Sequence, residues 1–279
     1  MSARPHLPPL TRAVVIGASG RMGQALLRAA PSFPQLIITG AIASAGSLAL
    51  GRDVGRLAGM GNANLPITSD LPAALAEADV ALDFSNAAAS RGNLQACRAA
   101  RKPLLLGTTG FGAELDAELE AAAHELALLV APNTSLGAAV LAELTRQAAG
   151  TLPANFDIDV LELHHRLKQD APSGTALALA RTAAEARGVP PPGSATSPGL
   201  PAGPRPEAGQ IGLASLRAGD IVGEHTVLFC GAGEELVLTH RARERGVFAR
   251  GALSAALWLS SRPPGRYGMR DFIFAKTEG

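Results

Sequence analysis

Three glycines near the N-terminus constrain the fold of this chain more than any other feature of its sequence. Gly17, Gly20 and Gly23 are spaced Gly-x-x-Gly-x-x-Gly, after the apolar residues 13–16 and before a helical pattern over residues 24–30. Glycine lets the chain turn sharply from a strand into a helix and lets the backbone approach a pyrophosphate closely. A tight turn without a ligand is the alternative. The place of the motif between the first strand and the first helix nevertheless predicts a dinucleotide-binding loop.

Short apolar runs alternate with helical patterns through the first half of the chain. Strands are predicted over residues 11–17, 36–42, 80–84, 104–106 and 126–131, and further helices over residues 72–78 and 113–125. This alternation is typical of βαβ units on a parallel sheet. We therefore expect an N-terminal Rossmann-like dinucleotide-binding domain of the α/β class.

The pattern changes after residue 133. Helices are predicted over residues 136–149, 175–187 and 246–259, strands over residues 156–164, 211–217, 223–229 and 235–241, and a Pro- and Gly-rich loop over residues 188–209. A run of strands after a mixed half predicts a C-terminal α+β domain with an open mixed sheet. The 279 residues suit two domains better than one.

Composition and charge exclude several classes of partner. The formal net charge is +1 and aromatic residues make up 4%, which gives no basis for binding nucleic acid. No window approaches the roughly 18 uninterrupted apolar residues of a membrane span, and the N-terminus carries no apolar stretch of signal length. We therefore expect a cytoplasmic protein without a membrane partner.

The candidate cofactor-binding residues come from loops that follow predicted strands. An NAD-specific site usually carries an acidic residue on the ribose, but the chain has no Asp or Glu between residues 36 and 52. Ser44 could hydrogen-bond a 2′-phosphate there, so the sequence favours NADPH, although a missing acid also fits a loose choice between NADPH and NADH. The predicted cofactor-binding set is Gly17, Ala18, Ser19, Gly20, Arg21, Met22, Gly23, Ser44, Phe84, Gly107, Thr108, Thr109, Ala131, Pro132, Asn133 and Thr134.

The segment over residues 162–176, Glu-Leu-His-His-Arg-Leu-Lys-Gln-Asp-Ala-Pro-Ser-Gly-Thr-Ala, is the richest in chemistry. Five ionisable side chains fall within residues 164–170, and a histidine can give or take a proton near neutral pH. Ser173, Gly174 and Thr175 fit a helix N-terminus, where N–H groups and a hydroxyl bind a carboxylate. An ordinary pair of surface histidines is the alternative. A metal site would need a third ligand that the sequence does not clearly supply, so we predict none.

This segment resembles the signature of the dihydrodipicolinate reductases, Glu-x-His-His-x-x-Lys-x-Asp-Ala-Pro-Ser-Gly-Thr-Ala, without a gap. The glycine loop is similar to the family's Gly-x-x-Gly-Arg-Met-Gly. Further matching blocks lie at residues 83–85, 107–111, 131–135, 217–220, 223–226 and 256–259. The resemblance implies hydride transfer from NAD(P)H to a cyclic imine dicarboxylate. The product would be tetrahydrodipicolinate, formed with loss of water from the 4-hydroxy substrate, in the diaminopimelate route of lysine biosynthesis.

The resemblance also implies roles for individual residues. His164 corresponds to the general acid/base and Lys168 to a proton donor. His165, Gly174 and Thr175 correspond to substrate-binding positions, to which the helix-start argument adds Ser173. The family is typically a homotetramer built through the sheet of its second domain. Its C-terminal stretch returns to the cofactor domain, so we expect a dinucleotide-binding domain over residues 1–134 and 244–279 and a substrate domain over residues 135–243.

Two departures from the family pattern concern the cofactor. Ala43 and Ser44 stand where many members have an acidic and a basic residue, and Asn86-Ala87 replaces a pair that often contains Arg or Pro. Cofactor preference is therefore not carried over. Two other functions stay open at this point. Another two-domain NAD(P)-dependent dehydrogenase should lack the His-His-x-x-Lys block, and a non-catalytic dinucleotide sensor should have lost His164 or Lys168.

Overall fold

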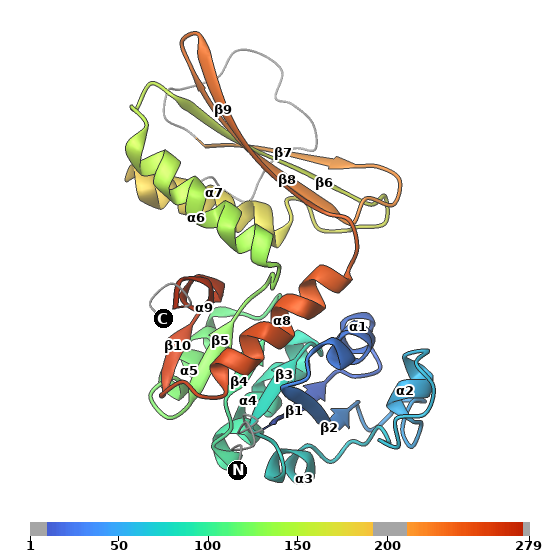
Figure 1. The fold of residues 1–279 in the computed structure, drawn as a ribbon. Coiled ribbons are helices and arrows are strands. Elements are labelled where there is room, and N and C mark those ends of the chain that lie inside the picture. The colour runs from blue at the N-terminus through green and yellow to red at the C-terminus, as the bar shows by residue number, and fades with distance from the viewer. Residues whose placement is uncertain (1–9, 192–210, 276–279) are drawn as a thin grey trace, which may run out of the picture. The chain divides into compact units, whose positions relative to one another are not determined.

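The computed structural model describes residues 10–191 and 211–275 of the chain. They divide into two compact units (Figure 1). The first comprises the chain up to Ser135 together with the segment from Gly246 onward, and the second is Leu136–Arg245. Most of the Pro- and Gly-rich loop predicted over residues 188–209 lies outside the described residues.

The first unit is built on a six-stranded parallel sheet in the order β10-β5-β4-β3-β1-β2. The strands are β1 (Thr11–Ile16), β2 (Leu36–Ile42), β3 (Val80–Asp83), β4 (Leu104–Leu106), β5 (Ala127–Val130) and β10 (Gly265–Tyr267). The helices are α1 (Arg21–Ala29), η1 (Ala30–Ser32), α2 (Val54–Leu57), α3 (Leu71–Ala76), α4 (Ala87–Ala100), α5 (Ala113–Ala122), α8 (Gly246–Leu259) and α9 (Met269–Phe274). The predicted Rossmann-like parallel sheet is confirmed.

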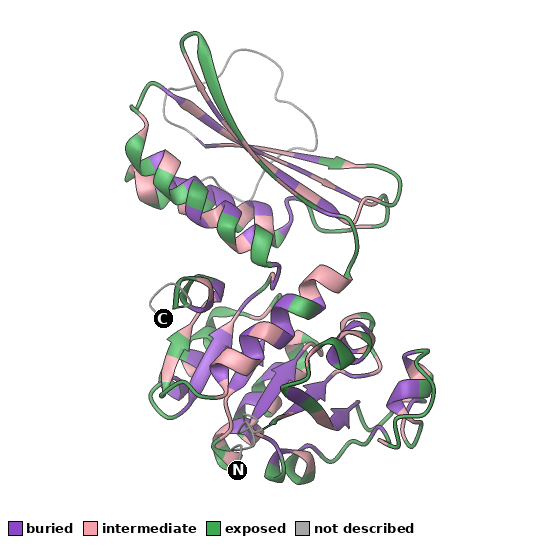
Figure 2. Cartoon of the chain, viewed as in Figure 1, coloured by how far each residue is buried: buried purple, intermediate pink, exposed green. Residues whose placement is uncertain are grey.

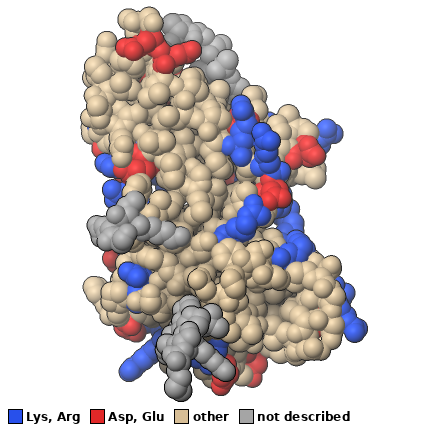
Figure 3. Space-filling model, in the orientation of Figure 1, with Lys and Arg blue, Asp and Glu red and all other residues tan. Residues whose placement is uncertain are grey.

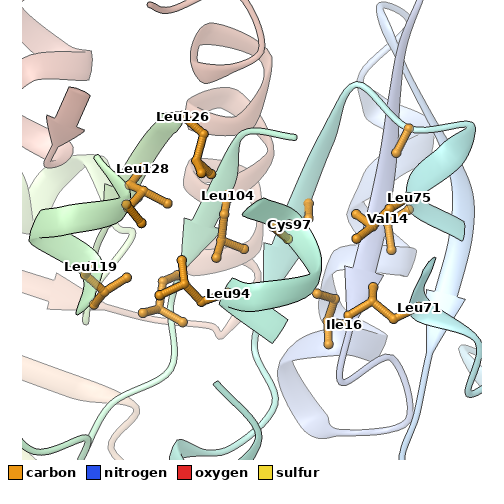
Figure 4. Close-up of a cluster of buried hydrophobic side chains, with 14 of the residues drawn as sticks. Val14, Ile16, Leu71, Leu75, Leu94, Cys97, Leu104, Leu119, Leu126 and Leu128 are labelled. Carbon is orange, nitrogen blue, oxygen red and sulfur yellow. The ribbon is translucent and has the colours of Figure 1, made fainter. Parts of the chain in front are cut away.

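Helices cover both faces of this sheet, which explains why its strands are continuous apolar runs. Helices α3, α4 and α5 share a core with one face, where Val14, Ile16, Leu104 and Leu128 meet side chains such as Leu119 (Figure 4). Helices α1 and α8 contact each other, and α8 contacts β3, β4 and β5. Strand β1 lies between β2 and β3. The chain runs from β1 to β2 on one side of it and then crosses back to β3 on its other side. Ligands bind at the carboxyl ends of the strands at such a reversal.

Five elements of the first unit were not predicted, namely η1, α2, α4, β10 and α9. Helix α4 begins after Asn86, whose side chain accepts a hydrogen bond from the N–H of Ala89 at 3.1 Å. Strand β10 has three residues and α9 has six, both too short for a periodic signal. Helix α1 begins at Arg21 rather than residue 24 because Gly20 is its N-cap.

The second unit has a four-stranded mixed sheet in the order β7-β6-β8-β9. Strand β6 (Asp157–His164) is parallel to β7 (Ile211–Arg217) and antiparallel to β8 (Gly223–Gly231), which pairs antiparallel with β9 (Glu234–Ala242). Helices α6 (Leu136–Thr151) and α7 (Gly174–Arg187) contact each other, α7 contacts β6, β7 and β8, and α6 contacts β9. The predicted open mixed sheet is confirmed.

Burial alternates along β6 with the period of a strand (Figure 2). Ile158 and Val160 are buried in the core that the sheet shares with α6 and α7, and Glu162 and His164 continue the same face. The intervening residues lie on the opposite, uncovered face. The alternation therefore carries two ionisable side chains to the covered face at the end of the strand.

Within the part of the chain that the structure describes, no helix is both long and apolar enough to cross a bilayer.

Candidate active site

The predicted cofactor-binding residues all lie at one edge of the first unit's sheet. The glycine loop follows β1, Ser44 follows β2, Phe84 follows β3, Gly107–Thr109 follows β4, and residues 131–134 follow β5. Carboxyl ends of parallel strands share one edge, so the structure brings these five loops together.

The glycine loop has the geometry that its spacing predicts. Gly17 has φ 84°, and a Cβ on it would lie 2.6 Å from the carbonyl oxygen of Phe84. A Cβ on Gly23 would lie 2.3 Å from the carbonyl oxygen of Gly17. Gly20 caps α1 without a side chain, so the N–H groups at the start of this nine-residue helix are left for a ligand. The loop is therefore shaped for close approach of a phosphate.

A fully buried carboxylate, Asp83, connects the loops that follow β3 and β4. It accepts hydrogen bonds from the backbone N–H of Ser85 at 2.9 Å and from the Thr108 hydroxyl at 3.3 Å. Its other oxygen accepts from the Asn93 amide at 2.9 Å. The ring of Phe84 packs where a side chain on residue 107 would be, which explains the glycine there. The sequence analysis named residue 83 only within a matching block and did not predict this role.

The side chains of the predicted cofactor residues differ in accessibility. Ser44 and Arg21 are exposed. Ala18 and Ala131 are buried, so only their backbone can meet a ligand. The hydroxyl of Thr134 is buried and donates to the carbonyl of Phe248 at 2.7 Å, which gives this side chain a structural partner.

Strand register in the second unit lines up polar residues across the covered face of its sheet. Glu162 on β6 is opposite His225 on β8, and His225 is opposite His240 on β9. One step further along, His164 on β6 is opposite Arg217 on β7. These five side chains come from four strands, so the sheet brings together residues that are far apart in sequence.

Glu162 is at the centre of this cluster and is fully buried. Its Oε2 is hydrogen-bonded to Nδ1 of His164, while Oε1 accepts from Nη2 of Arg217 at 2.8 Å and from the backbone N–H of Ser173 at 3.2 Å. Burial raises the pKa of the Glu162 carboxyl, but the hydrogen bonds from His164 and Arg217 outweigh it and lower the pKa to about 2. Glu162 is therefore a carboxylate at neutral pH.

His225 packs edge-on against His164, with ring centroids 5.2 Å apart. Burial, and then the charge of His164, lowers the pKa of His225 to about 4, so this ring is neutral at physiological pH. Its Nε2 lies 3.1 Å from the hydroxyl of Ser173. That hydroxyl also caps α7, accepting from the N–H of Ala176 at 3.2 Å. Ser173 therefore fixes the site from within, while Gly174 and Thr175 are the more accessible residues of the helix start.

The loop between β6 and α7 holds the remaining predicted residues. Nζ of Lys168 is 2.8 Å from Oδ2 of Asp170, and Nη2 of Arg217 donates to the carbonyl of Asp170 at 2.6 Å. Nε2 of His165 lies 3.4 Å from Nη2 of Arg245. Lys and Arg side chains gather along one side of this unit with a few acidic side chains among them, and further acidic side chains lie at its tip (Figure 3). An anionic ligand is therefore favoured near the loop.

Three ionisable groups here are close enough to surround an ion. The ligating atoms of Glu162, His164 and His225 lie within 4.8 Å of one another, which supplies the third group that the sequence did not indicate. These atoms are already hydrogen-bonded to each other, to Arg217 and to Ser173. We do not identify them as metal ligands, and the absence of a metal stays a prediction.

Comparison with known proteins identifies the family to which this chain belongs. Residues 11–134 match the family model described as the N-terminus of dihydrodipicolinate reductase, and residues 137–273 match the model of its C-terminus. The chain belongs to the dihydrodipicolinate reductase family. The expected family is confirmed, as is the enzyme class, an NAD(P)H-dependent oxidoreductase with 4-hydroxy-tetrahydrodipicolinate reductase activity in lysine biosynthesis.

Individual relatives agree with this family. The 4-hydroxy-tetrahydrodipicolinate reductase of Anaeromyxobacter dehalogenans (strain 2CP-1) is 46% identical over 266 residues, covering 95% of this chain and 98% of the relative. That of Alkalilimnicola ehrlichii is 45% identical over 263 residues, covering 94% and 98%.

Solved structures show how widely the fold is shared. The dipicolinate-bound dihydrodipicolinate reductase from Paenisporosarcina sp. TG-14 has a TM-score of 0.74 at 23% identity, covering 94% of this chain and 99% of that one. An amine dehydrogenase from Mycobacterium smegmatis reaches 0.61 at 17% identity, covering 93% and 95%. The fold alone thus fits other dehydrogenases, and sequence distinguishes this family from them.

Proposed function

We propose that His164 and Lys168 carry the catalytic chemistry of this dihydrodipicolinate reductase family member. The buried Glu162–His164 pair supports this proposal most strongly, because a carboxylate beside a histidine is a common arrangement for proton transfer. A bound nicotinamide would supply the hydride for an electron-poor carbon of the substrate, and His164 would act as the positioned acid that donates a proton where negative charge develops. Lys168 lies on the loop that follows β6, four residues after His164, and would supply a second proton or hold the charge.

The substrate is proposed to be a small cyclic dicarboxylate held by the second unit. One carboxylate would meet the N–H groups and hydroxyl at the start of α7, at Gly174 and Thr175, and His165 would contribute a further donor. Helix α7 has 14 residues, and its N-terminus favours an anion. The name of the Paenisporosarcina structure, which records bound dipicolinate, is consistent with such a ligand.

The first unit is proposed to bind the dinucleotide. The pyrophosphate would lie on the glycine loop and the start of α1, and the nicotinamide near Phe84, Gly107–Thr109 and residues 131–133. We propose a preference for NADPH over NADH, because Ser44 is exposed where the ribose would lie. The nearest acid after β2, Asp53, is occupied by backbone N–H groups, including that of Ala63 at 2.9 Å.

The homotetramer is proposed to form through the uncovered face of the second unit's sheet. Among the described residues, Leu161 and Leu163 lie on that face, and so do Leu216, 53% exposed, and Val237, 47% exposed. Exposed apolar side chains on one uncovered sheet face are typical of an interaction surface. Val237→Asp should dissociate the tetramer in analytical ultracentrifugation, whereas Leu236→Asp, on the other face of β9, should leave it assembled. A monomeric wild type would contradict this proposal.

A cytoplasmic location is proposed as well, where metabolism supplies NAD(P)H.

The catalytic proposal is tested by following nicotinamide absorbance. Substrate is generated in place from pyruvate and aspartate semialdehyde by the preceding enzyme, with NADPH and then with NADH. His164→Asn and Lys168→Met should each lower kcat about 10²- to 10⁴-fold while cofactor affinity stays near wild type. Lys102→Met, a lysine on the first unit between α4 and β4, is the matched control. Wild-type turnover in both site variants would overturn the assigned roles.

A further inference from the structure

The two oxygens of Glu162 have different sets of partners. Oε1 receives two hydrogen bonds, from Nη2 of Arg217 at 2.8 Å and from the backbone N–H of Ser173 at 3.2 Å. Oε2 faces Nδ1 of His164. Arg217 also donates to the carbonyls of Asp170 and Leu216, so its guanidinium is fixed from three directions. The carboxylate therefore cannot rotate without losing several hydrogen bonds.

This arrangement determines where the His164 ring carries its proton. An ionised carboxylate only accepts hydrogen bonds, so the nitrogen that faces it must donate. Nδ1 of His164 is then protonated in every protonation state of the ring. A transferable proton can reside only on Nε2, and it does so in the imidazolium form, whose charge Glu162 compensates.

Nε2 points to a position that the chain leaves open. A Cβ on Gly223 would lie 3.1 Å from Nε2 of His164 and 3.4 Å from its Cδ2. Glycine at the start of β8 therefore leaves space beside this nitrogen. His225, which packs edge-on against His164 and is itself held by Ser173, borders the same space, because its Cε1 would lie 3.9 Å from that Cβ.

Charged and titratable side chains surround His164 from the four strands of the sheet and from the loop before α7. Glu162 lies on β6, Arg217 on β7 and His225 on β8, with His240 beyond it on β9. The loop before α7 adds Lys168 and Asp170, which are paired with each other. Arg217 is bound to Oε1, on the far side of the carboxylate from His164, so it anchors Glu162 without occupying Oε2.

We propose that Glu162, anchored by Arg217 and Ser173, is a positioning residue that fixes the tautomer of His164 and so makes Nε2 the proton-donating atom, in the space beside Gly223. This inference rests on the proposed role of His164 as the acid. It adds a residue that acts through His164 and a specific nitrogen on that ring.

Glu162→Gln tests the proposal with almost no change of shape. Two donors face Oε1, so the glutamine carbonyl takes that place and its NH₂ faces Nδ1 of His164. Nδ1 must then accept a hydrogen bond, and the neutral ring carries its proton on Nε2. The imidazolium is disfavoured, because it would place two donors against each other. Replacing the carboxylate of a protease triad with an amide in the same way lowers turnover about 10⁴-fold through the wrong tautomer.

Two measurements on the full-length protein give the result. In ¹⁵N-histidine spectra, wild-type His164 should keep Nδ1 protonated at every pH, and Glu162→Gln should move the proton of the neutral ring to Nε2. In assays with NADPH, the variant should lose roughly 10³- to 10⁴-fold in kcat, with KM changed far less and the alkaline limb of its pH profile at lower pH. Glu143→Gln, a second buried glutamate of the same unit, paired with Arg146 on α6, should leave both readouts unchanged.

The outcomes separate this inference from the function on which it rests. A neutral wild-type His164 protonated on Nε2 would overturn the tautomer assignment without any variant. A Glu162→Gln protein with the shifted tautomer and near wild-type kcat would overturn the positioning role. If His164→Asn keeps full turnover, the proposed acid is wrong, whatever the spectra show for Glu162.

Discussion

Among the described residues, burial lowers the pKa of two histidines, His225 and His240, and acidification should destabilise this protein mainly through His225. The ring is 4% exposed, and burial, followed by the charge of His164, lowers its pKa from 6.5 to about 4. Between these two values the unfolded chain binds a proton on His225 and the folded chain does not. Stability from the neutral ring is therefore fully present above pH 6.5 and is lost as the pH falls toward 4. A pKa lowered by this amount corresponds to about 3 kcal/mol.

The measurement compares the wild type with His225→Gln, which has a side chain of similar reach that can accept a hydrogen bond from Ser173 but cannot be protonated. Urea midpoints are recorded from pH 7.5 down to pH 4.5, the range in which His225 titrates only in the unfolded chain. The wild type should lose most of the 3 kcal/mol relative to the variant. Glu162, whose pKa is about 2, loses its contribution mainly below this range and is present in both proteins.

Parallel loss of stability in the two proteins would refute the reasoning, because it would mean that folding does not hold the ring neutral. His124→Gln is the matched control, since His124 is an exposed histidine of the first unit. This control should follow the wild type at every pH. A direct check is the ¹³C resonance of His225, which should titrate near pH 4 in the folded protein.

Three further outcomes follow from the first unit. Ser44→Arg should raise the NADPH-to-NADH ratio of kcat/KM about tenfold or more, because an exposed guanidinium would meet a 2′-phosphate; an unchanged ratio would show that the ribose lies elsewhere. Gly23→Ala should weaken NADPH binding about tenfold or more in a fluorescence titration, because its methyl group would lie 2.3 Å from the carbonyl oxygen of Gly17; wild-type affinity would count against the glycine loop as the phosphate site. Burial, and then the charge of Asp83, raises the pKa of the Cys97 thiol to about 12. Iodoacetamide at neutral pH should therefore leave Cys97 unmodified until the protein is unfolded, which peptide mass spectrometry can show.

Local patterns were sufficient to predict most of the first unit. Strands β1 to β5 are short runs that are apolar on both faces, and the glycine loop has to lie where a strand turns into a helix. Helix α4 was missed, although Asn86 before an Ala-rich stretch is an N-cap signal that could have been used. Strand β10 could not be found in this way, because its three residues are a strand only by pairing with β5.

The polar cluster around Glu162 in the second unit, which we propose to be catalytic, was only half predictable. The segment over residues 162–176 supplied His164, His165 and Lys168 from one continuous motif. Glu162 lies in that motif, two residues before His164 and on the same face of the strand. Nothing in the local sequence showed that Glu162 would be buried and ionised. Its partner Arg217 lies 55 residues away, and the contact between Ser173 and His225 spans 52 residues. Such partners are created by strand pairing rather than by sequence spacing.

Strand register therefore decides which residues of β8 belong to the site. Alternation along β8 shows that Glu224 and His225 lie on opposite faces, but not which of them faces the helices. The observed pairing of Glu162 with His225 settles this. A slip by one residue would move His225 to the uncovered face and bring a neighbour of it opposite Glu162. The buried apolar residues Val227 and Phe229 oppose such a slip, because they would leave the core together with His225. The hydrophobic pattern of β8 thus fixes the position of His225 in the candidate site, although this histidine carries no local signal of its own.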